Sequence, residues 1–402
     1  MRALFGCPVL AQGHWEKDKA VLVGNGVIRD IVAVDRIPDD AERVFLDGGY
    51  LAPGFIDLQV NGGGGVLLND APTVETIGTI AKAHRAFGTT GFLPTLISDT
   101  PEMIARTILS VDEAISLGVP GVLGIHIEGP VLNVEKKGVH DPKRFRDLDD
   151  DFIDVLTGLK NGKTLVTLAP EKTAPGQIAE LVKRGVVVWA GHTNADYETV
   201  LQAIQEGLSG FTHLYNAMSP LTGRAPGVVG AALDSGDTWA GVIADGFHVH
   251  DASLRAAIKC KGVQKTILVT DAMPSVGAPA GFDGFDLFGE WVDATRPRLT
   301  IESGNLAGSS LDMMSAVRYA HGHLGVSLAD AIFMASLGPA QAIGLGDQTG
   351  DIAEGRQAGL VHITDEGGVD RSWVKGEESV IIPVGETVQT PPTARAGNVY
   401  AC

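Results

Sequence analysis

The stretch GIHIEGPVLN, residues 124–133, decides the fold, because a buried strand ends there on a carboxylate. Residues 119–127 are apolar, rich in branched side chains and free of charge, which is typical of a strand buried on both faces. Glu128 follows at once, and the next dipeptide, Gly129-Pro130, can continue neither a strand nor a helix. Burying a carboxylate is costly unless a cation compensates it. Taken alone, Glu128 is interpreted as a turn carboxylate, and only similar residues at other strand ends would make it part of a site.

The middle of the chain repeats the pattern of strand, loop and helix. Eight apolar runs alternate, for the most part, with segments that have the i, i+3/i+4 apolar spacing of surface helices. Two further helices are expected after the last run, the second opened by a capping pattern at Ser327 and Asp330. Eight alternations over about 300 residues predict a (β/α)8 TIM-type barrel. An open doubly wound sheet is the alternative, although no G-x-G-x-x-G leads into a helix. The runs cover residues 49–59, 90–98, 121–128, 165–171, 185–192, 209–216, 239–248 and 265–272.

Both ends of the chain are expected to form short strands. Residues 1–50 alternate β-type runs with turns and contain an Asn25-Gly26 hairpin signal. Residues 358–366 and 379–389 have the same character, followed by a polar end expected to fray. Two β segments at opposite ends of a chain are most simply one small β-sandwich domain. We therefore expect residues 1–50 and 351–402 to form the sandwich and residues 51–350 to form the barrel.

Composition narrows the class of protein. The net charge of −18 weighs against binding to nucleic acid or to anionic membranes, and an anionic substrate would need a local cationic site. No apolar run approaches the roughly 18 residues of a membrane span, and the first residues lack a signal-peptide core. Cys7, Cys260 and Cys402 are scattered and odd in number, which predicts a reducing compartment and no cysteine-based zinc site. The prediction is a cytoplasmic globular protein.

Five of the eight runs carry, at or near their ends, a candidate residue for binding a metal ion or moving a proton: Glu128, His192, His213, His248 and Asp271. In a barrel these ends meet at one face. The chain has 11 histidines, and three of them fall at consecutive strand ends, which structural histidines alone would not explain. Glu128, His192 and His213 form the His₂Glu set of catalytic zinc sites. Such an ion acidifies water, and Asp271 could take a proton from that water and return it to a leaving group.

Several residues of similar chemistry are expected to be structural. His126 shares a strand face with Glu128 and is expected to line the barrel. Asp57 is expected to be a structural carboxylate inside the barrel. His250 lies too far beyond its strand to serve as a ligand. His321 and His323 fall on a late helix and are expected at the surface or in packing.

The chain resembles the amidohydrolase superfamily, and within it a branch that deacetylates amino-sugar phosphates. The resemblance covers almost the whole length, and two of its blocks are specific to that branch. These blocks are EGP with KKGVH, in residues 128–140, and HLYNAMSPLTGRAPG, residues 213–227. The other matching segments are residues 51–65, 167–171, 190–198, 244–250, 268–274 and 305–313. The resemblance implies that Glu128, His192 and His213 bind the metal and that Asp271 is the catalytic acid/base.

The resemblance also implies the contacts to the substrate. His140 would reach the acetamido carbonyl and stabilise the oxyanion, and Asn216 and Ala217 would contact the sugar phosphate. Arg224 would bind the phosphate held by the neighbouring subunit, which implies a homodimer, and His248 would lie near the same ligand.

One feature departs from the superfamily pattern. Many members have H-x-H at the end of the first barrel strand, where it holds a second metal, and this chain has Gln59-Val60-Asn61. Neutral amides are poor ligands for zinc or iron. We therefore expect Gln59 and Asn61 to line the site and one divalent ion to bind per subunit, zinc first, with iron or cobalt as alternatives.

The expected reaction is hydrolysis of N-acetylglucosamine 6-phosphate to glucosamine 6-phosphate and acetate, in amino-sugar catabolism or cell-wall recycling. Three alternatives stay open. The substrate could be the isomeric N-acetylgalactosamine 6-phosphate, or a cyclic amide, although enzymes of that second kind usually carry H-x-H. The chain could also be a non-catalytic binding protein with the same fold, which would be expected to have lost ligands that are present here.

Overall fold

The computed structural model describes residues 1–380, and its centre is a closed parallel barrel. Eight parallel strands follow one another in chain order around the sheet. The parallel bridge Val60–Ala272 and the hydrogen bond from Asp271 N to Gln59 O (3.0 Å) join the last strand segment to the first. This closure confirms the predicted barrel and excludes the open sheet. The strands are β8 (Phe55–Val60), β11 (Thr89–Ile97), β12 (Gly124–Glu128), β13 (Lys163–Leu168), β14 (Val187–Ala190), β15 (Gly210–Phe211), β16 (Trp239–Val242) and β17 (Thr266–Leu268).

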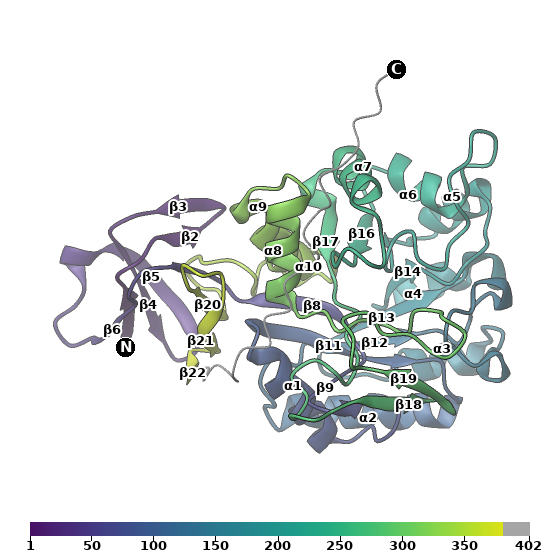
Figure 1. Cartoon of the computed structure of the whole chain (residues 1–402), viewed down its shortest axis with the longest axis horizontal. Coiled ribbons are helices and arrows are strands. Elements are labelled where there is room, and N and C mark those ends of the chain that lie inside the picture. Colours follow the sequence, from purple (N-terminus) through teal and green to yellow (C-terminus); the bar gives the residue numbers. More distant parts are fainter. Residues whose placement is uncertain (381–402) are drawn as a thin grey trace.

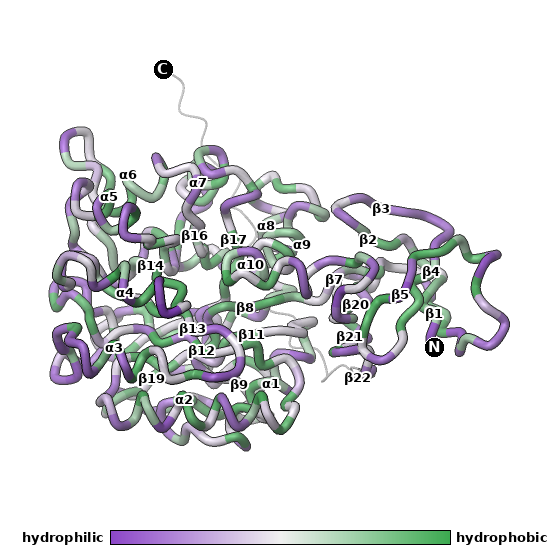
Figure 2. The backbone as a smooth tube through the Cα atoms, turned by 180° about the vertical axis from the view of Figure 1, so that it is seen from behind, coloured by the Kyte–Doolittle hydropathy of each residue, from purple (hydrophilic) through white to green (hydrophobic). Residues whose placement is uncertain are grey.

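Helices surround the barrel and pack their apolar faces on it. Hydrophobic and hydrophilic residues alternate along α1 and α2 (Figure 2), as expected of helices with one buried face. The predicted cap is confirmed, because Ser327 Oγ accepts a hydrogen bond from Asp330 N at 3.1 Å. The helices are α1 (Val74–Arg85), α2 (Pro101–Ser116), α3 (Asp150–Leu156), α4 (Gln177–Lys183), α5 (Tyr197–Gln205), α6 (Gly227–Asp234), α7 (Asp251–Lys261), α8 (Met313–His323), α9 (Leu328–Ala335) and α10 (Leu337–Ala342). Short 3₁₀ turns cover Val34–Arg36, Val134–Lys136, Pro142–Arg144, Pro170–Lys172 and Val263–Lys265.

Two further sheets combine both ends of the chain on one side of the barrel (Figure 1). One has the order β5-β4-β1-β6 and the other β22-β21-β20-β7-β2-β3. They share an apolar core that includes Leu4, Leu51 and Trp373, so the predicted sandwich is confirmed. The strands are β1 (Arg2–Phe5), β2 (Val9–Ala11), β3 (His14–Glu16), β4 (Lys19–Gly24), β5 (Val27–Ala33), β6 (Glu42–Phe45), β7 (Tyr50–Pro53), β20 (Leu360–Ile363), β21 (Val369–Val374) and β22 (Glu377–Val380).

The structure confirms one predicted detail of these sheets, a hairpin turn, and corrects another, the extent of the first apolar run. Asn25 and Gly26 form the predicted β4–β5 hairpin turn with φ of 54° and 74°. The first apolar run is two strands, because β7 pairs with β20 in the terminal sheet while β8 enters the barrel. Gly54 separates them, where an added Cβ would lie 2.1 Å from Thr90 Oγ1. The expected strand at 379–389 falls mostly outside the described residues, as does the polar end.

Two hairpins were not predicted from the sequence. One pairs β9 (Gly62–Gly63) with β10 (Val66–Leu67), directly after the first barrel strand. The other pairs β18 (Gly284–Leu287) with β19 (Glu290–Asp293), between β17 and α8. Its side chains Phe285, Leu287 and Val292 share an apolar cluster with residues at the ends of β10 and β11 and beyond β17: Leu67, Ile97, Met273, Leu299, Ile301 and Ala307. The second hairpin therefore covers part of the barrel face at which the strands end.

Among residues 1–380, no helix has both the length and the apolar character needed to cross a membrane.

Candidate active site

Four candidate residues meet at the carboxyl ends of the barrel strands. Glu128 is the last residue of β12, and His192, His213 and Asp271 follow β14, β15 and β17 within a few residues. Glu128 Oε1 lies 3.1 Å from His192 Nε2 and 3.0 Å from His213 Nε2, and the two Nε2 atoms are 3.1 Å apart. Glu128, His192 and His213 are buried. The structure thus brings together the three residues predicted to bind a metal.

The backbone at these strand ends is strained. His192, His213 and Asp271 have φ of 49°, 34° and 54°, in the left-handed region that residues with a Cβ rarely adopt. Such conformations cost free energy and persist where the surrounding structure enforces them, commonly at functional sites. At His192 the carbonyl accepts a hydrogen bond from Asn133 N (2.9 Å). These left-handed turns direct the side chains of His192, His213 and Asp271 into one site.

The tautomer of His192 indicates a cation site. His192 Nδ1 lies 2.8 Å from the carbonyl oxygen of Lys136, which can only accept, so Nδ1 carries the proton. In the neutral ring Nε2 then presents a lone pair to the Glu128 carboxylate and to His213 Nε2. Glu128 Oε1 and His192 Nε2, two lone-pair atoms 3.1 Å apart, repel each other without a proton or cation between them, whereas the ligands of a tetrahedral zinc ion lie roughly 3.3 Å apart. The donor set therefore fits a divalent metal ion, and the hydrogen bond from Nδ1 to a carbonyl is the usual way to orient such a ligand.

His140 also approaches this cluster, but its hydrogen bonds make it a donor. Ligand atoms of Glu128, His140 and His192 lie within 4.8 Å of one another, so His140 competes with His213 as a candidate ligand. However, the backbone N–H of Ser98 donates to His140 Nδ1 at 3.3 Å, and Ser98 Oγ lies 2.7 Å from the same nitrogen. Nδ1 is therefore the acceptor and Nε2 carries the proton. Burial, with help from the nearby His192, lowers the pKa of His140 to about 3, so this ring is a neutral N–H donor.

Asp271 accepts hydrogen bonds from the side-chain amides of Gln59 and Asn61, and Gln59 connects it to the Glu128 cluster. Asn61 Nδ2 donates to Asp271 Oδ1 at 2.7 Å, and Gln59 Nε2 donates to the same oxygen at 3.1 Å. Gln59 Nε2 also lies 3.3 Å from each carboxylate oxygen of Glu128. Burial and the negative charge of Glu128 raise the pKa of Asp271 to about 6. Gln59 and Asn61 thus line the site as predicted and offer hydrogen-bond donors where a second metal would need ligands.

Burial and hydrogen bonding act in opposite directions on Glu128. Burial works against its ionisation, but the neighbouring imidazole rings of His192 and His213 outweigh burial and hold its pKa well below the usual range. Two neighbouring carboxyl groups therefore have pKa values pushed apart, a pattern that marks acid/base assignments in enzyme sites.

The residues expected to contact substrate do not all lie next to the Glu128 cluster. Asn216 and Ala217 follow His213 directly, and Tyr215 and Ala217 also have left-handed backbone (φ 80° and 49°). His248 follows β16 and is bonded through Nδ1 to Asp245 Oδ2 at 2.6 Å. Arg224 lies in an exposed loop before α6, and no residue in the described part of the chain forms a hydrogen bond or ion pair with it. Among residues 1–380 of one subunit, no contact connects Arg224 with the Glu128 cluster.

The residues expected to be structural have ordinary partners. His126 lies inside the barrel between Thr95 Oγ1 (3.2 Å) and Thr167 Oγ1 (2.8 Å), and burial lowers its pKa to about 4. Asp57 accepts hydrogen bonds from Thr270 and from Gln59 N, across the seam where the barrel closes. His250 is the exposed N-cap of α7, and His321 and His323 are exposed on α8.

Three residues of the site were not singled out from the sequence. Ser98 fixes His140, Glu171 accepts hydrogen bonds from the residues beside His192, and Asp245 binds His248. Ser98 and Glu171 are the last residues of the second and fourth apolar runs, so the strand-end position that identified the candidate ligands would have found them too. Asp245 precedes its histidine by only three residues.

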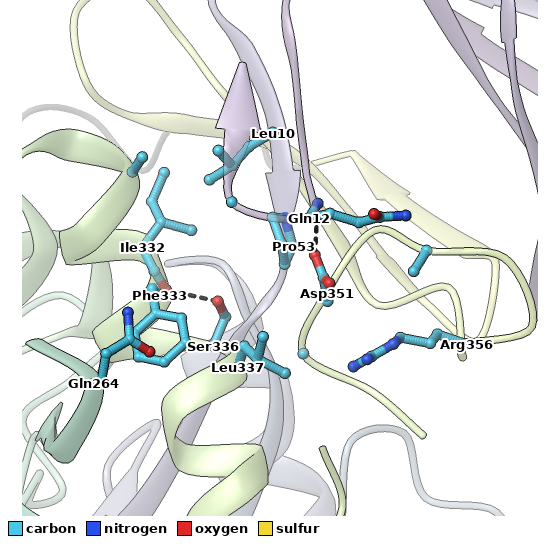
Figure 3. A pocket seen from close by; sticks show the side chains of 14 residues that line it. Leu10, Gln12, Pro53, Gln264, Ile332, Phe333, Ser336, Leu337, Asp351 and Arg356 are labelled. Atoms are coloured by element: carbon cyan, nitrogen blue, oxygen red, sulfur yellow. Dashed lines mark hydrogen bonds between the residues drawn. The ribbon is translucent and has the colours of Figure 1, made fainter. Parts of the chain in front are cut away.

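Two cavities differ in their relation to this site. One of about 500 Å³ lies between the terminal sheet and the helices α9 and α10, lined by Leu10, Phe333 and Leu337 with Asp351 and Arg356 at its edge (Figure 3). Its lining contains no histidine or cysteine and includes Pro53, the last residue of β7. The other, of about 120 Å³, is lined by His140 and Pro142 and by Leu287 and Phe288 of the β18–β19 hairpin. Of these two cavities, only the smaller one is lined by a candidate residue of the site, His140.

A barrel whose strand ends present a buried glutamate and histidines to one point is an architecture used by metal-dependent hydrolases. Residues 50–378 match the amidohydrolase family, and the chain belongs to that family.

Curated relatives and a solved structure cover nearly the whole chain. An N-acetylgalactosamine-6-phosphate deacetylase from Shewanella sp. (strain ANA-3) is 45% identical, over 92% of this chain and 94% of the relative. An N-acetylglucosamine-6-phosphate deacetylase from Haemophilus influenzae is 36% identical, over 93% and 98%. The crystal structure of N-acetylglucosamine-6-phosphate deacetylase from Pasteurella multocida is 35% identical, covers 94% of this chain and 99% of its own, and superposes with a TM-score of 0.91.

Proposed function

We propose that the protein is a metal-dependent deacetylase that hydrolyses N-acetylglucosamine 6-phosphate to glucosamine 6-phosphate and acetate. One observation carries this proposal: side-chain ligand atoms of Glu128, His192 and His213 converge beside Asp271 and a neutral His140 donor. The family and the named activities of relatives at 35–45% identity support the same reaction.

Glu128, His192 and His213 would hold one divalent ion per subunit, with zinc as the first candidate and iron or cobalt as alternatives. Such an ion would supply Lewis acidity, which makes water more acidic and stabilises negative charge on oxygen. Gln59 and Asn61 support the single ion, because each directs an amide N–H₂ towards carboxylates and not a lone pair towards a second cation.

The reaction then depends on two protein groups. Asp271 accepts a proton from the attacking water and delivers it to the amine nitrogen as the C–N bond breaks. His140 Nε2–H donates to the carbonyl oxygen while its negative charge develops. Because His140 is neutral and held by Ser98, it can donate without first losing or gaining a proton.

Recognition of the phosphate would involve a second subunit. We propose that backbone N–H groups near Asn216 and Ala217 contact the sugar phosphate and that Arg224 of the adjacent subunit in a homodimer binds the phosphate. Two features support this assignment: Arg224 is exposed, and apolar side chains are exposed around the same barrel face. Of the nine large hydrophobic side chains exposed in the described residues, five lie on loops or the hairpin at that face: Val134, Leu221, Phe247, Phe288 and Trp291. We also propose a cytoplasmic location, because Cys7 and Cys260 are free thiols.

N-acetylgalactosamine 6-phosphate is the second candidate substrate. The specific observation in its favour is the 45% identity to a relative named for that activity, against 36% for the relative named for the glucosamine isomer. The two sugars differ in the orientation of one ring hydroxyl, so a few pocket contacts decide between them.

One assay tests these proposals together. Acetate release is measured with both hexosamine 6-phosphates and with a cyclic amide, before and after treatment with a chelator, and metal content is determined on the same protein. We expect release from a hexosamine phosphate only, loss of activity with chelator, and about one metal equivalent per chain. Turnover of the cyclic amide alone, or of no substrate by metal-loaded protein, would refute the function, and two equivalents would refute the single-ion site.

A further inference from the structure

The cavity of about 500 Å³ between the terminal sheet and the barrel lies outside the candidate active site. Leu10 of β2 and Pro53 of β7 line one side, and Ile332 and Phe333 of α9 and Leu337 of α10 line the other (Figure 3). Small-molecule sites have volumes of roughly 300–1,000 Å³, mostly apolar walls and a few polar groups. The cavity therefore has the size and the apolar surface of such a site.

One carboxylate oxygen faces this cavity without a partner. Asp351 lines the cavity and is 8% exposed. Its Oδ1 accepts a hydrogen bond from Gln12 N at 3.1 Å, whereas Oδ2 has no hydrogen-bond partner among residues 1–380. Oδ2 nevertheless keeps some accessible surface, so this surface opens into the cavity. A carboxylate oxygen in such an enclosed position is costly without a donor, and an ammonium group would supply one.

A guanidinium group lines the same cavity and keeps free donors. Arg356 Nη1 donates to the carbonyl oxygens of Gly346 and Thr349. In the described part of the chain, Arg356 Nε and Nη2 have no hydrogen-bond partner. The side chain extends towards Leu337 (Figure 3). Because arginine donors match the two oxygens of a carboxylate, this side of the cavity suits a carboxylate group.

The two charged groups do not neutralise each other. Neither Asp351 nor Arg356 forms an ion pair with the other or with any further residue of 1–380. Backbone groups hold each of them in place, through Gln12 N and through the two carbonyl oxygens bound by Arg356. A simple cation would be repelled by Arg356 and a simple anion by Asp351. An α-amino acid carries an ammonium and a carboxylate on one carbon and satisfies both groups.

We propose that this cavity binds an apolar α-amino acid, with its ammonium group on Asp351 Oδ2, its carboxylate on Arg356 and its side chain against Phe333 and Leu337. The site does not depend on the proposed deacetylase function, because its lining shares no residue with the Glu128 cluster. Its walls come from the terminal β domain and from the barrel helices. The ligand would therefore contact both parts of the molecule, and its binding should raise the Tm.

Isothermal titration calorimetry of the wild type with L-leucine and L-phenylalanine tests the ligand class. We expect one site per chain, with a Kd of about 1 mM or tighter for at least one of them. N-acetyl-leucine lacks the ammonium group and leucinamide lacks the carboxylate, so each should bind about tenfold to a hundredfold more weakly than leucine. No binding of either amino acid up to about 10 mM overturns the proposal, as does leucinamide or N-acetyl-leucine binding as tightly as leucine.

Two further measurements locate the site. Amino acids also bind metal ions, so the titration is repeated after treatment with a chelator, and the Kd should be unchanged. In Asp351→Asn the amide oxygen can still accept from Gln12 N while its N–H₂ faces the ammonium group, so the Kd should rise about tenfold to a hundredfold. Asp347→Asn, exposed in the same loop, is the matched control and should bind as the wild type does. Loss of binding with the chelator, or an unchanged Kd in Asp351→Asn, overturns the site. The comparison of leucine with its two analogues tests the same contacts without a substitution.

Discussion

Asp271 and Glu128 are neighbouring buried carboxyl groups that the protein treats in opposite ways. Glu128 faces two imidazole rings and one amide, whereas Asp271 receives the amide donors of Gln59 and Asn61 and the repulsion of Glu128. Glu128 is thereby kept ionised, as a metal ligand must be, and Asp271 retains an appreciable affinity for a proton. A group that must accept a proton and return it within one turnover needs that intermediate affinity.

The proton-transfer role predicts the behaviour of Asp271→Asn. An amide of the same size cannot accept the proton of water, so kcat should fall by about 10²- to 10⁴-fold. Metal content should stay at the wild-type value, because Asp271 contacts the ligands only through Gln59. Steady-state kinetics and metal analysis of the same preparation measure both effects. A variant with near wild-type kcat would remove Asp271 from the mechanism.

Glu128→Gln should have the opposite profile. The substitution replaces an anionic ligand by a neutral amide, and Gln59 Nε2, which now contacts both Glu128 oxygens, would face a second amide. We expect the metal affinity to fall by about tenfold to a hundredfold or more. The purified variant should therefore contain little metal. Competition with a chromophoric chelator measures this loss. Full metal occupancy with slow turnover would show that the two histidines hold the ion without the carboxylate.

Asp57 predicts how stability depends on pH. Burial raises its pKa to about 7, against the lowering effect of its hydrogen bonds with Thr270 and Gln59, while an unfolded aspartate ionises near about 4. Between these values the folded state holds more protons than the unfolded state, so the free energy of unfolding decreases as pH rises from about 4 to 7. Asp57→Asn removes this contribution and should be stabilised relative to the wild type at pH 8 by on the order of a few kcal/mol.

Denaturant unfolding of chelator-treated protein at pH 5 and pH 8 measures that difference without interference from bound metal. Asp39→Asn, an exposed substitution in the terminal β domain, serves as the control and should follow the wild-type profile. The prediction is wrong if the free energy of unfolding of Asp57→Asn changes between pH 5 and pH 8 as much as that of the wild type. Asp57 would then be ionised in the folded protein at both pH values.

At the scale of elements, the site is held by loops that fasten one another. Glu171, in the 3₁₀ turn after β13, accepts hydrogen bonds from Asn133 Nδ2 (2.8 Å) in the loop after β12. It also accepts from Thr193 Oγ1 (2.5 Å) and Asn194 N (2.7 Å), directly after His192. One carboxylate thus joins three consecutive βα loops, and His192 keeps its left-handed backbone between them.

Glu171→Gln should therefore weaken metal binding without touching a ligand. The amide loses one acceptor, the loop at His192 loosens, and the metal dissociation constant should rise about tenfold, as is usual for groups that orient ligands. Glu198→Gln, exposed on α5, is the matched control and should leave the constant unchanged. Chelator competition gives the constants and thermal unfolding checks that both variants are folded; an unchanged constant for Glu171→Gln would mean that the strained turn at His192 is self-supporting.

The elements that could be predicted from the sequence are those with a regular pattern. Eight buried runs separated by amphipathic segments specify the barrel, and the position of Glu128, His192, His213 and Asp271 at run ends follows from the topology. The β18–β19 hairpin could not be found in this way, because its strands are four residues each and only part of each is buried. Its stability comes from residues far away in sequence, such as Leu67 and Ile97, and no local pattern encodes such contacts.

The tautomers of the individual histidine rings could not be predicted from the sequence either. The strand-end pattern placed His192 at the site and the family resemblance implied His140 there, but their tautomers depend on Ser98 N and Lys136 O, which come from other loops. The contact with Ser98 makes His140 a hydrogen-bond donor through Nε2, and the contact with Lys136 leaves His192 Nε2 with a lone pair for a metal ion. Residue type and spacing alone cannot distinguish these roles.

At the scale of the whole molecule, a net charge of −18 repels a phosphorylated sugar. The described part of one subunit places no ion-paired arginine or lysine at the Glu128 cluster, while Arg224 extends from an exposed loop on the same face. A complete phosphate site would then require a second subunit, and the active unit would be the dimer.

Mixing two inactive variants tests this directly. Asp271→Asn lacks the proton acceptor, and Arg224→Ala lacks the phosphate contact and should raise KM by about tenfold to a hundredfold. In a mixed dimer, the subunit with Arg224→Ala keeps its own Asp271 and receives Arg224 from its partner, so one site of the two is wild type. Random reassociation of equal amounts should therefore restore about a quarter of wild-type activity at low substrate concentration. Each variant incubated alone through the same dissociation step is the control, and a mixture no more active than the sum of these controls would show that Arg224 acts within its own subunit or not at all.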